Sequence, residues 1–519
     1  MTIVESRLVA DRSSKEIGAV SVAYRVAAGL FAATALINVA AVIDETTPLP
    51  FTHLAAALLS IYLFLECSLY LRSSDSFGVL SPAFLALIFH FSLAYLVPIT
   101  AASFQPRVME RFNEWLPDLD ASLFQVLVLC GLAAFCMLRG YTATQPIARA
   151  LRCSANKSRL LRSHSQVNLR LVWGMQVVFL VFVSYSIDLG IYGMLSTKEE
   201  LAKYASVAQF IKLALAAGTL SFFLILLSYF KRREQGRRSS VHSILIALLM
   251  AFHILCGILS GFKSQVVMPL VIAGFAYFLS TGRAPRNLIV SAFVALILAY
   301  LVIEPYRVYL SLRESATVSM TEAIGMIEIV VSERERLMHI SDVSLAESIV
   351  SRFDISGMTA LAVNYVDSGA LQAEKRREFQ NSIYWSPILA YIPRAVWPGE
   401  KPSFSHNGAW FNQQVRGRWN DDTTSVGMGP IGYLYMAGGV LAVVLGFFGL
   451  GVLQALIFDG LARGGGGGLI IFLSVASSII LIPSSFGPAL VGVLQLLPVA
   501  LVGQMLLLRR SGAKNASRG

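Results

Sequence analysis

The chain has few charged residues for its length. Of its 519 residues, 14% are charged and 55% are hydrophobic, whereas ordinary globular domains are about 25% charged and about 45–50% apolar. The apolar residues are gathered into repeated runs of about 20, the length that crosses the hydrocarbon core of a bilayer as an α-helix. This composition excludes a water-soluble fold and predicts an all-α polytopic membrane protein.

Cysteine is also scarce. Four of the five cysteines fall inside hydrophobic runs, and the fifth, Cys153, lies in a basic loop. Their spacing offers neither a disulfide framework nor a pair of zinc ligands, so we expect neither feature. The N-terminal segment lacks an obvious small-residue cleavage site before the first hydrophobic run, which predicts an uncleaved first helix.

Twelve hydrophobic runs are interpreted as membrane spans, and a long polar stretch separates the ninth from the tenth. The chain therefore divides into spans 1–9 (residues 1–303), a loop domain (304–428), and spans 10–12 with a terminal tail (429–519). The expected spans are 20–43, 51–71, 78–100, 121–141, 169–193, 207–230, 242–262, 264–281, 287–303, 429–458, 468–483 and 487–508.

Arginine and lysine are concentrated in alternate short loops. They occur before the first span, in the 142–168 loop, between Lys231 and Arg238, and after Arg509. Because Lys and Arg beside span ends mark the cytoplasmic face, both termini are predicted to be cytoplasmic and the 304–428 loop to lie on the opposite face. The formal net charge of +11 follows from this bias, and no nucleic-acid motif accompanies it.

The 304–428 loop is predicted to be mostly helical in its first part. Capping-box spacings predict helices near 320–339 and 344–351, and another helix is expected from Gly357 to Val366. Prolines at positions 387, 393, 398 and 402 exclude a long helix beyond Trp385. The basic run Lys375-Arg376-Arg377 is interpreted as a solvated helix face.

Four short motifs lie in or beside these regions. They are Ser260-Gly261-Phe262-Lys263-Ser264, Arg352-Phe353-Asp354, the run from Ile392-Pro393-Arg394 through Trp397-Pro398 to Lys401-Pro402, and the Gly429-to-Gly439 start of span ten. Together they resemble the Wzy-type O-antigen and exopolysaccharide polymerases, which are oligosaccharide repeat-unit polymerases. The Ile-Pro-Arg-x-x-Trp-Pro-x-x-Lys-Pro run is the most specific part. The motif resemblance covers mainly 257–265 and 350–450, while the expected topology agrees along nearly the whole chain.

The resemblance implies a GT-C-like membrane glycosyltransferase of a bacterial inner membrane, with the long loop in the periplasm. Enzymes of this family transfer a growing glycan from undecaprenyl pyrophosphate to the non-reducing end of another lipid-linked repeat unit. The donor carries its own leaving group, so no nucleotide sugar, cofactor or metal is expected. The expected partners are the undecaprenyl-pyrophosphate-linked oligosaccharide and the bilayer; a chain-length regulator and a flippase are further candidates, and nucleic acid is not.

Fixed cations are candidates for binding the departing pyrophosphate, because they oppose the negative charge that develops on it. Arginine suits this role since its planar fork bonds phosphate oxygens in pairs. Arg394 is the first choice, and the other candidates are Arg352, Lys401, Lys263 and Arg307. Arg394 has an alternative role, a salt bridge that fixes the loop. Arg352 has another, an ion pair with Asp354 two residues away.

A base must accept the proton of the acceptor hydroxyl. The candidate bases are Asp354, His406 and Glu400; an unperturbed histidine titrates near neutrality. Candidates for sugar contact are Trp397, Trp410, Asp421 and Asp422. Anchoring at the membrane interface explains the tryptophans equally well. The adjacent aspartates alone are a weak metal signal, so no metal site is predicted.

Two other functions fit the sequence. O-antigen ligases have a similar topology, and Ser405-His406-Asn407-Gly408 is similar to their His-Asn element, but the Gly-x-x-Gly-Thr-His continuation is missing. A lipid-linked oligosaccharide flippase or other transporter is compatible with twelve spans, although the insertion after span nine breaks the symmetry expected of two six-span halves.

Overall fold

The computed structural model describes residues 16–44, 47–157, 166–193, 203–237, 239–283, 285–311, 320–333, 336, 355–389, 392, 407–421, 425–464, 466–480 and 486–509. These residues are almost entirely helical. Within them, the strands β1 (Gln166–Val167) and β2 (Leu508–Arg509) form a short antiparallel pair that ties the start of span five to the end of the last span.

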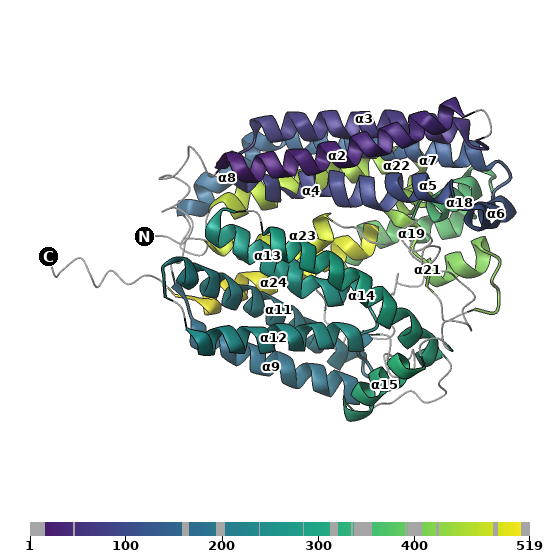
Figure 1. Cartoon of the computed structure of the whole chain (residues 1–519). Coiled ribbons are helices and arrows are strands. Elements are labelled where there is room, and N and C mark those ends of the chain that lie inside the picture. The colour runs from purple at the N-terminus through teal and green to yellow at the C-terminus, as the bar shows by residue number, and fades with distance from the viewer. Residues whose placement is uncertain are drawn as a thin grey trace, which may run out of the picture.

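The long helices form two groups that lie side by side (Figure 1). One group, the N-terminal bundle, contains α2 (Glu16–Ile43), α3 (Pro50–Ser73), α7 (Leu119–Ala143), α22 (Gly429–Ala455), and a span built from α4 (Pro82–Ala86), η2 (Leu87–Leu96) and α5 (Val97–Ala102). The other, the middle bundle, contains α9 (Leu169–Asp188), α11 (Ala205–Glu234), α12 (Ser240–Leu259), α13 (Lys263–Thr281) and α14 (Arg286–Ser311). Helices α23 (Gly466–Ile480) and α24 (Phe486–Leu507) contact both groups and join them.

The shorter elements gather at the two ends of these bundles (Figure 1). At the right of the view, here the loop end, lie α6 (Pro106–Trp115), α15 (Met320–Ser332), α18 (Ser356–Asp367), α19 (Ala373–Tyr384), α20 (Ser386–Leu389), α21 (Asn407–Trp410) and η5 (Phe411–Val415). At the opposite end, the terminal end, lie η1 (Ser76–Leu80), α8 (Gln145–Lys157), η6 (Leu456–Leu461) and η7 (Ala462–Gly464).

Eleven of the described helices are long and apolar enough to cross a bilayer. This agrees with the predicted polytopic helical fold. The described part of the run predicted as span eleven, 468–483, lies in α23, whose apolar stretch Gly467–Ala476 is shorter than the other spans. In the loop, the helix expected from Gly357 to Val366 is found as α18, and the helix expected over 320–339 is found as the shorter α15. The helix predicted near 344–351 lies outside the described residues.

Helices α7 and α22 cross at glycines. A Cβ atom on Gly140 would lie 2.1 Å from the carbonyl oxygen of Phe448, and one on Gly451 would lie 1.9 Å from that of Met137. Small residues at a crossing let two backbones approach closely, which supplies the van der Waals contact that holds membrane helices together. This crossing joins span four to span ten.

Helix α22 is interrupted near its loop end. Gly439 has a φ of +64°, a left-handed conformation that glycine adopts without strain. The break leaves the carbonyl of Ala437 without its helical partner, and the side-chain amide of Gln380 in α19 donates to it at 2.8 Å. The break therefore attaches the loop segment that contains α19 to span ten.

Candidate functional site

The turn between α12 and α13 contains one of the predicted motifs, Ser260-Gly261-Phe262-Lys263-Ser264. Gly261 has a φ of +70°, so the chain reverses through a left-handed glycine. The hydroxyl of Ser260 donates to the carbonyl of Gly257 at 2.6 Å and accepts from the backbone N–H of Phe262 at 3.1 Å. These bonds set the direction in which the chain enters α13 at Lys263.

Helix α14 holds this turn from the side. Lys263 Nζ forms an ion pair with Glu304, and the Arg307 Nε–H donates to the carbonyl of Gly261 at 2.9 Å. Glu304 and Arg307 are three residues apart and share one face of α14. The side chains of Lys263 and Glu304 are only 11% and 10% exposed. The structure thus brings two of the predicted pyrophosphate-binding cations, Lys263 and Arg307, to one turn.

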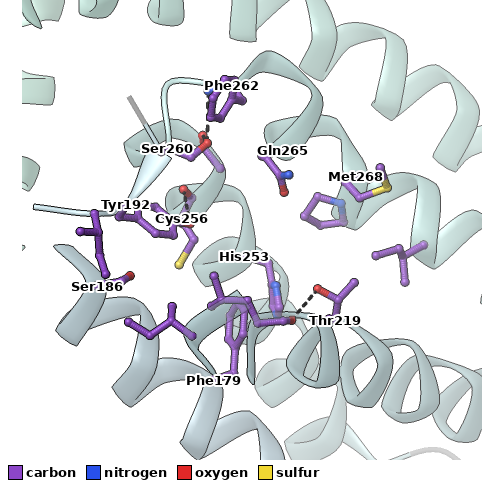
Figure 2. Close-up of a pocket in the computed structure, with 18 residues that line it drawn as sticks. Phe179, Ser186, Tyr192, Thr219, His253, Cys256, Ser260, Phe262, Gln265 and Met268 are labelled. Atoms are coloured by element: carbon purple, nitrogen blue, oxygen red, sulfur yellow. Dashed lines mark hydrogen bonds between the residues drawn. The ribbon is translucent and has the colours of Figure 1, made fainter. Parts of the chain in front are cut away.

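A cavity of about 430 Å³ lies beside this turn, between α9, α11, α12 and α13 (Figure 2). Its volume falls within the range of small-molecule sites. The walls are mostly apolar, with aromatic rings supplied by Phe179, Tyr192 and Phe262. The polar side chains that line it are those of Ser186, Tyr192, Thr219, His253, Ser260 and Gln265.

His253 lies between two phenyl rings at the border of the cavity. The imidazole stacks on Phe222 at 4.2 Å and on Phe179 at 4.7 Å between ring centroids. Its Nε2 is 3.1 Å from Oε1 of Gln176, whose amide nitrogen bonds Gly218 O at 2.6 Å and Ser221 Oγ at 2.5 Å. Ionisable residues inside spans are rare and commonly functional. A histidine inside a hydrophobic run is the sequence signal for this group, but nothing in the sequence links it to Gln176.

Tyr192 closes one side of the cavity. Its hydroxyl donates to the carbonyl of Cys256 at 3.0 Å. Burial raises the pKa of Tyr192 above its ordinary value, so the hydroxyl stays protonated at neutral pH and keeps this bond. The neighbouring Gly193 has a φ of +58°, and a Cβ there would lie 2.3 Å from the carbonyl oxygen of Ser260. The close approach of the two turns therefore requires glycine.

A second cluster at the loop end surrounds Trp410. The ammonium of Lys375 lies 4.7 Å from the Trp410 ring centroid, and Tyr365 and Phe379 contact the same ring edge-on. Lys375 also pairs with Glu378 at 2.8 Å and is only 12% exposed. The interpretation of Lys375-Arg376-Arg377 as a solvated face was therefore wrong for Lys375, because Trp410, distant in sequence, covers it. Cation–π contact of this kind fixes the tryptophan in place.

Asp421, a predicted sugar contact, is bonded within its own segment. Its carboxylate accepts from the Asn412 amide at 3.0 Å, and the amide oxygen of Asn412 accepts from Arg416 at 2.8 Å. The guanidinium of Arg416 lies 5.0 Å from the ring centroid of Trp115 in α6. These contacts order the 407–421 segment against α6.

The other predicted site residues fall outside the described residues. They are Arg352, Asp354, Arg394, Trp397, Glu400, Lys401, His406 and Asp422. Among the predicted residues that are described, Lys263 and Arg307 meet at one turn, whereas Trp410 and Asp421 belong to the 407–421 segment and contact other side chains there. Within the described ranges there is no cluster of three or more His, Cys, Asp or Glu residues that could hold a metal.

Comparison with known proteins adds no relative: no family model, no curated protein and no solved structure matches this chain.

Proposed function

We propose that the chain is a polysaccharide polymerase that transfers a growing glycan from undecaprenyl pyrophosphate to the non-reducing end of a lipid-linked repeat unit. The sequence motifs that resemble the Wzy-type polymerases support this proposal. The structural observation that carries it is the turn at Ser260–Lys263, to which α14 brings Arg307 and where Lys263 lies. A lipid diphosphate needs such cations for its head.

In the proposed reaction, a hydroxyl oxygen of the acceptor sugar attacks the anomeric carbon of the donor glycan. The bond from that carbon to the pyrophosphate oxygen breaks, and undecaprenyl pyrophosphate leaves. A base accepts the hydroxyl proton, for which Asp354, His406 and Glu400 remain candidates. Cations beside the leaving group stabilise the charge that it gains. Lys263 and Arg307 join Arg394, Arg352 and Lys401 in that proposed role.

Glu304 has a defined part in this proposal. Its carboxylate pairs with Lys263 in the structure. A diphosphate that binds at the turn either adds to this pair or displaces the carboxylate. Without substrate, Glu304 balances a largely buried ammonium, which would otherwise be costly to desolvate.

The activity is tested by incubating the purified protein in liposomes with a lipid-linked repeat unit and no nucleotide sugar. Ladders of longer lipid-linked glycans are the expected product, and chelators should leave them unchanged. Failure to extend the glycan by a folded, correctly inserted protein would overturn the proposal. Transfer to lipid A core instead would identify the ligase alternative.

The proposed location is a bacterial inner membrane, with the terminal end in the cytoplasm and the loop end in the periplasm. Cys153 allows a test, because it is exposed at the terminal end while the other four cysteines are buried. A membrane-impermeant maleimide should label Cys153 only after intact cells are permeabilised. The same reagent should label Ser368→Cys, in a Cys153→Ser background, in intact cells. The reverse pattern would invert the orientation.

One observation favours a transporter as the second candidate. Interrupted spans commonly form the binding sites of transporters, and α22 is interrupted at Gly438–Gly439. The carbonyl freed at this break is already bonded by Gln380, however, which indicates a structural role. Movement of a fluorescent lipid-linked sugar across sealed liposomes, without chain extension, would select the transporter.

A further inference from the structure

The polar side chains around the cavity offer a ligand mostly hydrogen-bond acceptors. Each of its four hydroxyl groups already donates to a backbone carbonyl, at distances from 2.6 to 3.0 Å. The pairs are Ser186 with Val183, Tyr192 with Cys256, Thr219 with Leu215, and Ser260 with Gly257. Because a carbonyl oxygen can only accept, the hydroxyl protons are committed and only oxygen lone pairs remain for a ligand.

The same reasoning fixes the tautomer of His253. The amide nitrogen of Gln176 is identified by its bond to the carbonyl of Gly218, so the atom that faces the imidazole is the acceptor Oε1. His253 Nε2 must then carry a proton. In the neutral ring, Nδ1 holds a lone pair, and no described residue bonds it. His253 therefore adds another acceptor to the cavity.

The lining is also uncharged. None of the described residues that line the cavity is an acid, a lysine or an arginine. The nearby Lys263 pairs with Glu304 and the nearby Arg307 bonds Gly261. Gln265, in the first turn of α13, is the lining residue whose side chain brings strong N–H donors (Figure 2). An anion placed here would face oxygen and nitrogen lone pairs with few donors, and its desolvation would be poorly offset.

We propose that this cavity binds an uncharged, hydroxyl-bearing group, each of whose O–H protons donates to one of the acceptors His253 Nδ1, Ser186 Oγ and Thr219 Oγ1, and that it excludes anions. The aromatic and aliphatic walls contact the apolar part of the ligand. Two sources have this chemistry, a lipid alcohol dissolved in the membrane and a sugar. The inference does not rest on the proposed polymerase activity, because it uses only the cavity and its hydrogen bonds.

The test measures binding to the purified full-length protein in detergent micelles by native mass spectrometry. Farnesol represents a lipid alcohol, methyl glucoside a sugar, farnesyl diphosphate an anion, and farnesane a hydrocarbon of similar shape. At least one of the two alcohols should bind saturably, and whichever binds identifies the source. Farnesol, if it is the ligand, should bind about tenfold more tightly than farnesane, since a single hydrogen bond separates them.

Variants tie the binding to the cavity. His253→Phe keeps an aromatic ring between Phe179 and Phe222 but removes the acceptor, so it should weaken alcohol binding about tenfold. It should leave any binding of farnesyl diphosphate unchanged. Thr219→Val removes a second acceptor with little change in shape and serves if His253→Phe does not fold. Thr142→Val is the matched control, because Thr142 makes the same bond to the residue four positions earlier, at 2.9 Å, in the other bundle.

The proposal would be overturned if neither alcohol binds, if farnesol is the alcohol that binds and farnesane binds as tightly, or if alcohol binding in both His253→Phe and Thr219→Val equals that of the wild type. These assays contain no lipid-linked repeat unit. A protein that binds the alcohol but does not extend glycans would therefore refute the polymerase proposal alone, and the converse result would refute the cavity proposal alone.

Discussion

The two bundles differ in how many of their helices are well buried. In the N-terminal bundle, the apolar windows of α3, the third span (Pro82–Ala102) and α7 are 50%, 67% and 56% buried, while those of α2 and α22 are 28% and 39% buried. In the middle bundle, the window of α11 is 50% buried, and those of α9, α12, α13 and α14 are between 22% and 33% buried. The spans of the two groups have similar hydropathy and length, so composition does not explain the difference. The helices that pack around each span do.

The buried polar residues of the two bundles also differ in what they contact. In the N-terminal bundle, the buried Asn38 amide donates to Thr100 at 2.9 Å, and its oxygen lies 2.7 Å from Nδ1 of His53. These groups hold α2, α3 and α5 together. In the middle bundle, His253 and Gln176 form a comparable network that borders the cavity. The N-terminal bundle is thus a network of interhelical bonds, whereas the comparable network of the middle bundle borders the cavity.

The largest expected effect is in the N-terminal bundle. Gly451→Leu would place a side chain where even a Cβ lies 1.9 Å from the carbonyl oxygen of Met137. The helices α7 and α22 would have to separate, at a cost of about 5 kcal/mol or more. Thermal unfolding in detergent should show a large loss of stability or no folded protein. Gly449→Leu is the control, since a Cβ there meets nothing within 4 Å; equal damage from both variants would contradict the tight crossing.

The next largest effect concerns the Lys263–Glu304 ion pair in the middle bundle, where stability and activity can be measured separately. Lys263→Met leaves Glu304 buried without its counter-ion and should destabilise the protein by about 3 kcal/mol. Lys263→Met combined with Glu304→Leu removes both charges and should recover most of that stability. Chain extension should remain lost in the double variant if Lys263 contacts the diphosphate. Full activity in the double variant would reduce the pair to a structural role.

The smallest effect concerns the junction between the loop and span ten. Gln380→Ala removes the donor to the Ala437 carbonyl and should cost about 1–2 kcal/mol. Gln372→Ala, at an exposed N-cap position of α19 with no side-chain capping bond, is the comparison variant. Unfolding temperatures measured side by side should fall only for Gln380→Ala. An equal change in both would show that α22 tolerates its break without help from α19.

The long helices and their ends could be predicted because membrane spans are encoded locally. A run of about 20 apolar residues has few other stable states in a bilayer, so the runs 20–43, 51–71 and 121–141 correspond closely to α2, α3 and α7. The turn at Ser260–Ser264 likewise has a local cause, because Gly261 supplies the left-handed conformation that such a turn needs.

Pairings between distant segments were not visible in the sequence. Lys263 was predicted only as a candidate pyrophosphate-binding cation, and nothing in the sequence indicated its ion pair with Glu304. Lys375 was expected in solvent, yet it lies on Trp410. The cavity depends on four helices and the glycine break depends on Gln380. Hydropathy and turn chemistry act over a few neighbouring residues and so determined the spans by themselves. Only tertiary packing decided which charges meet and where space remains, because those contacts join residues that are far apart in the chain.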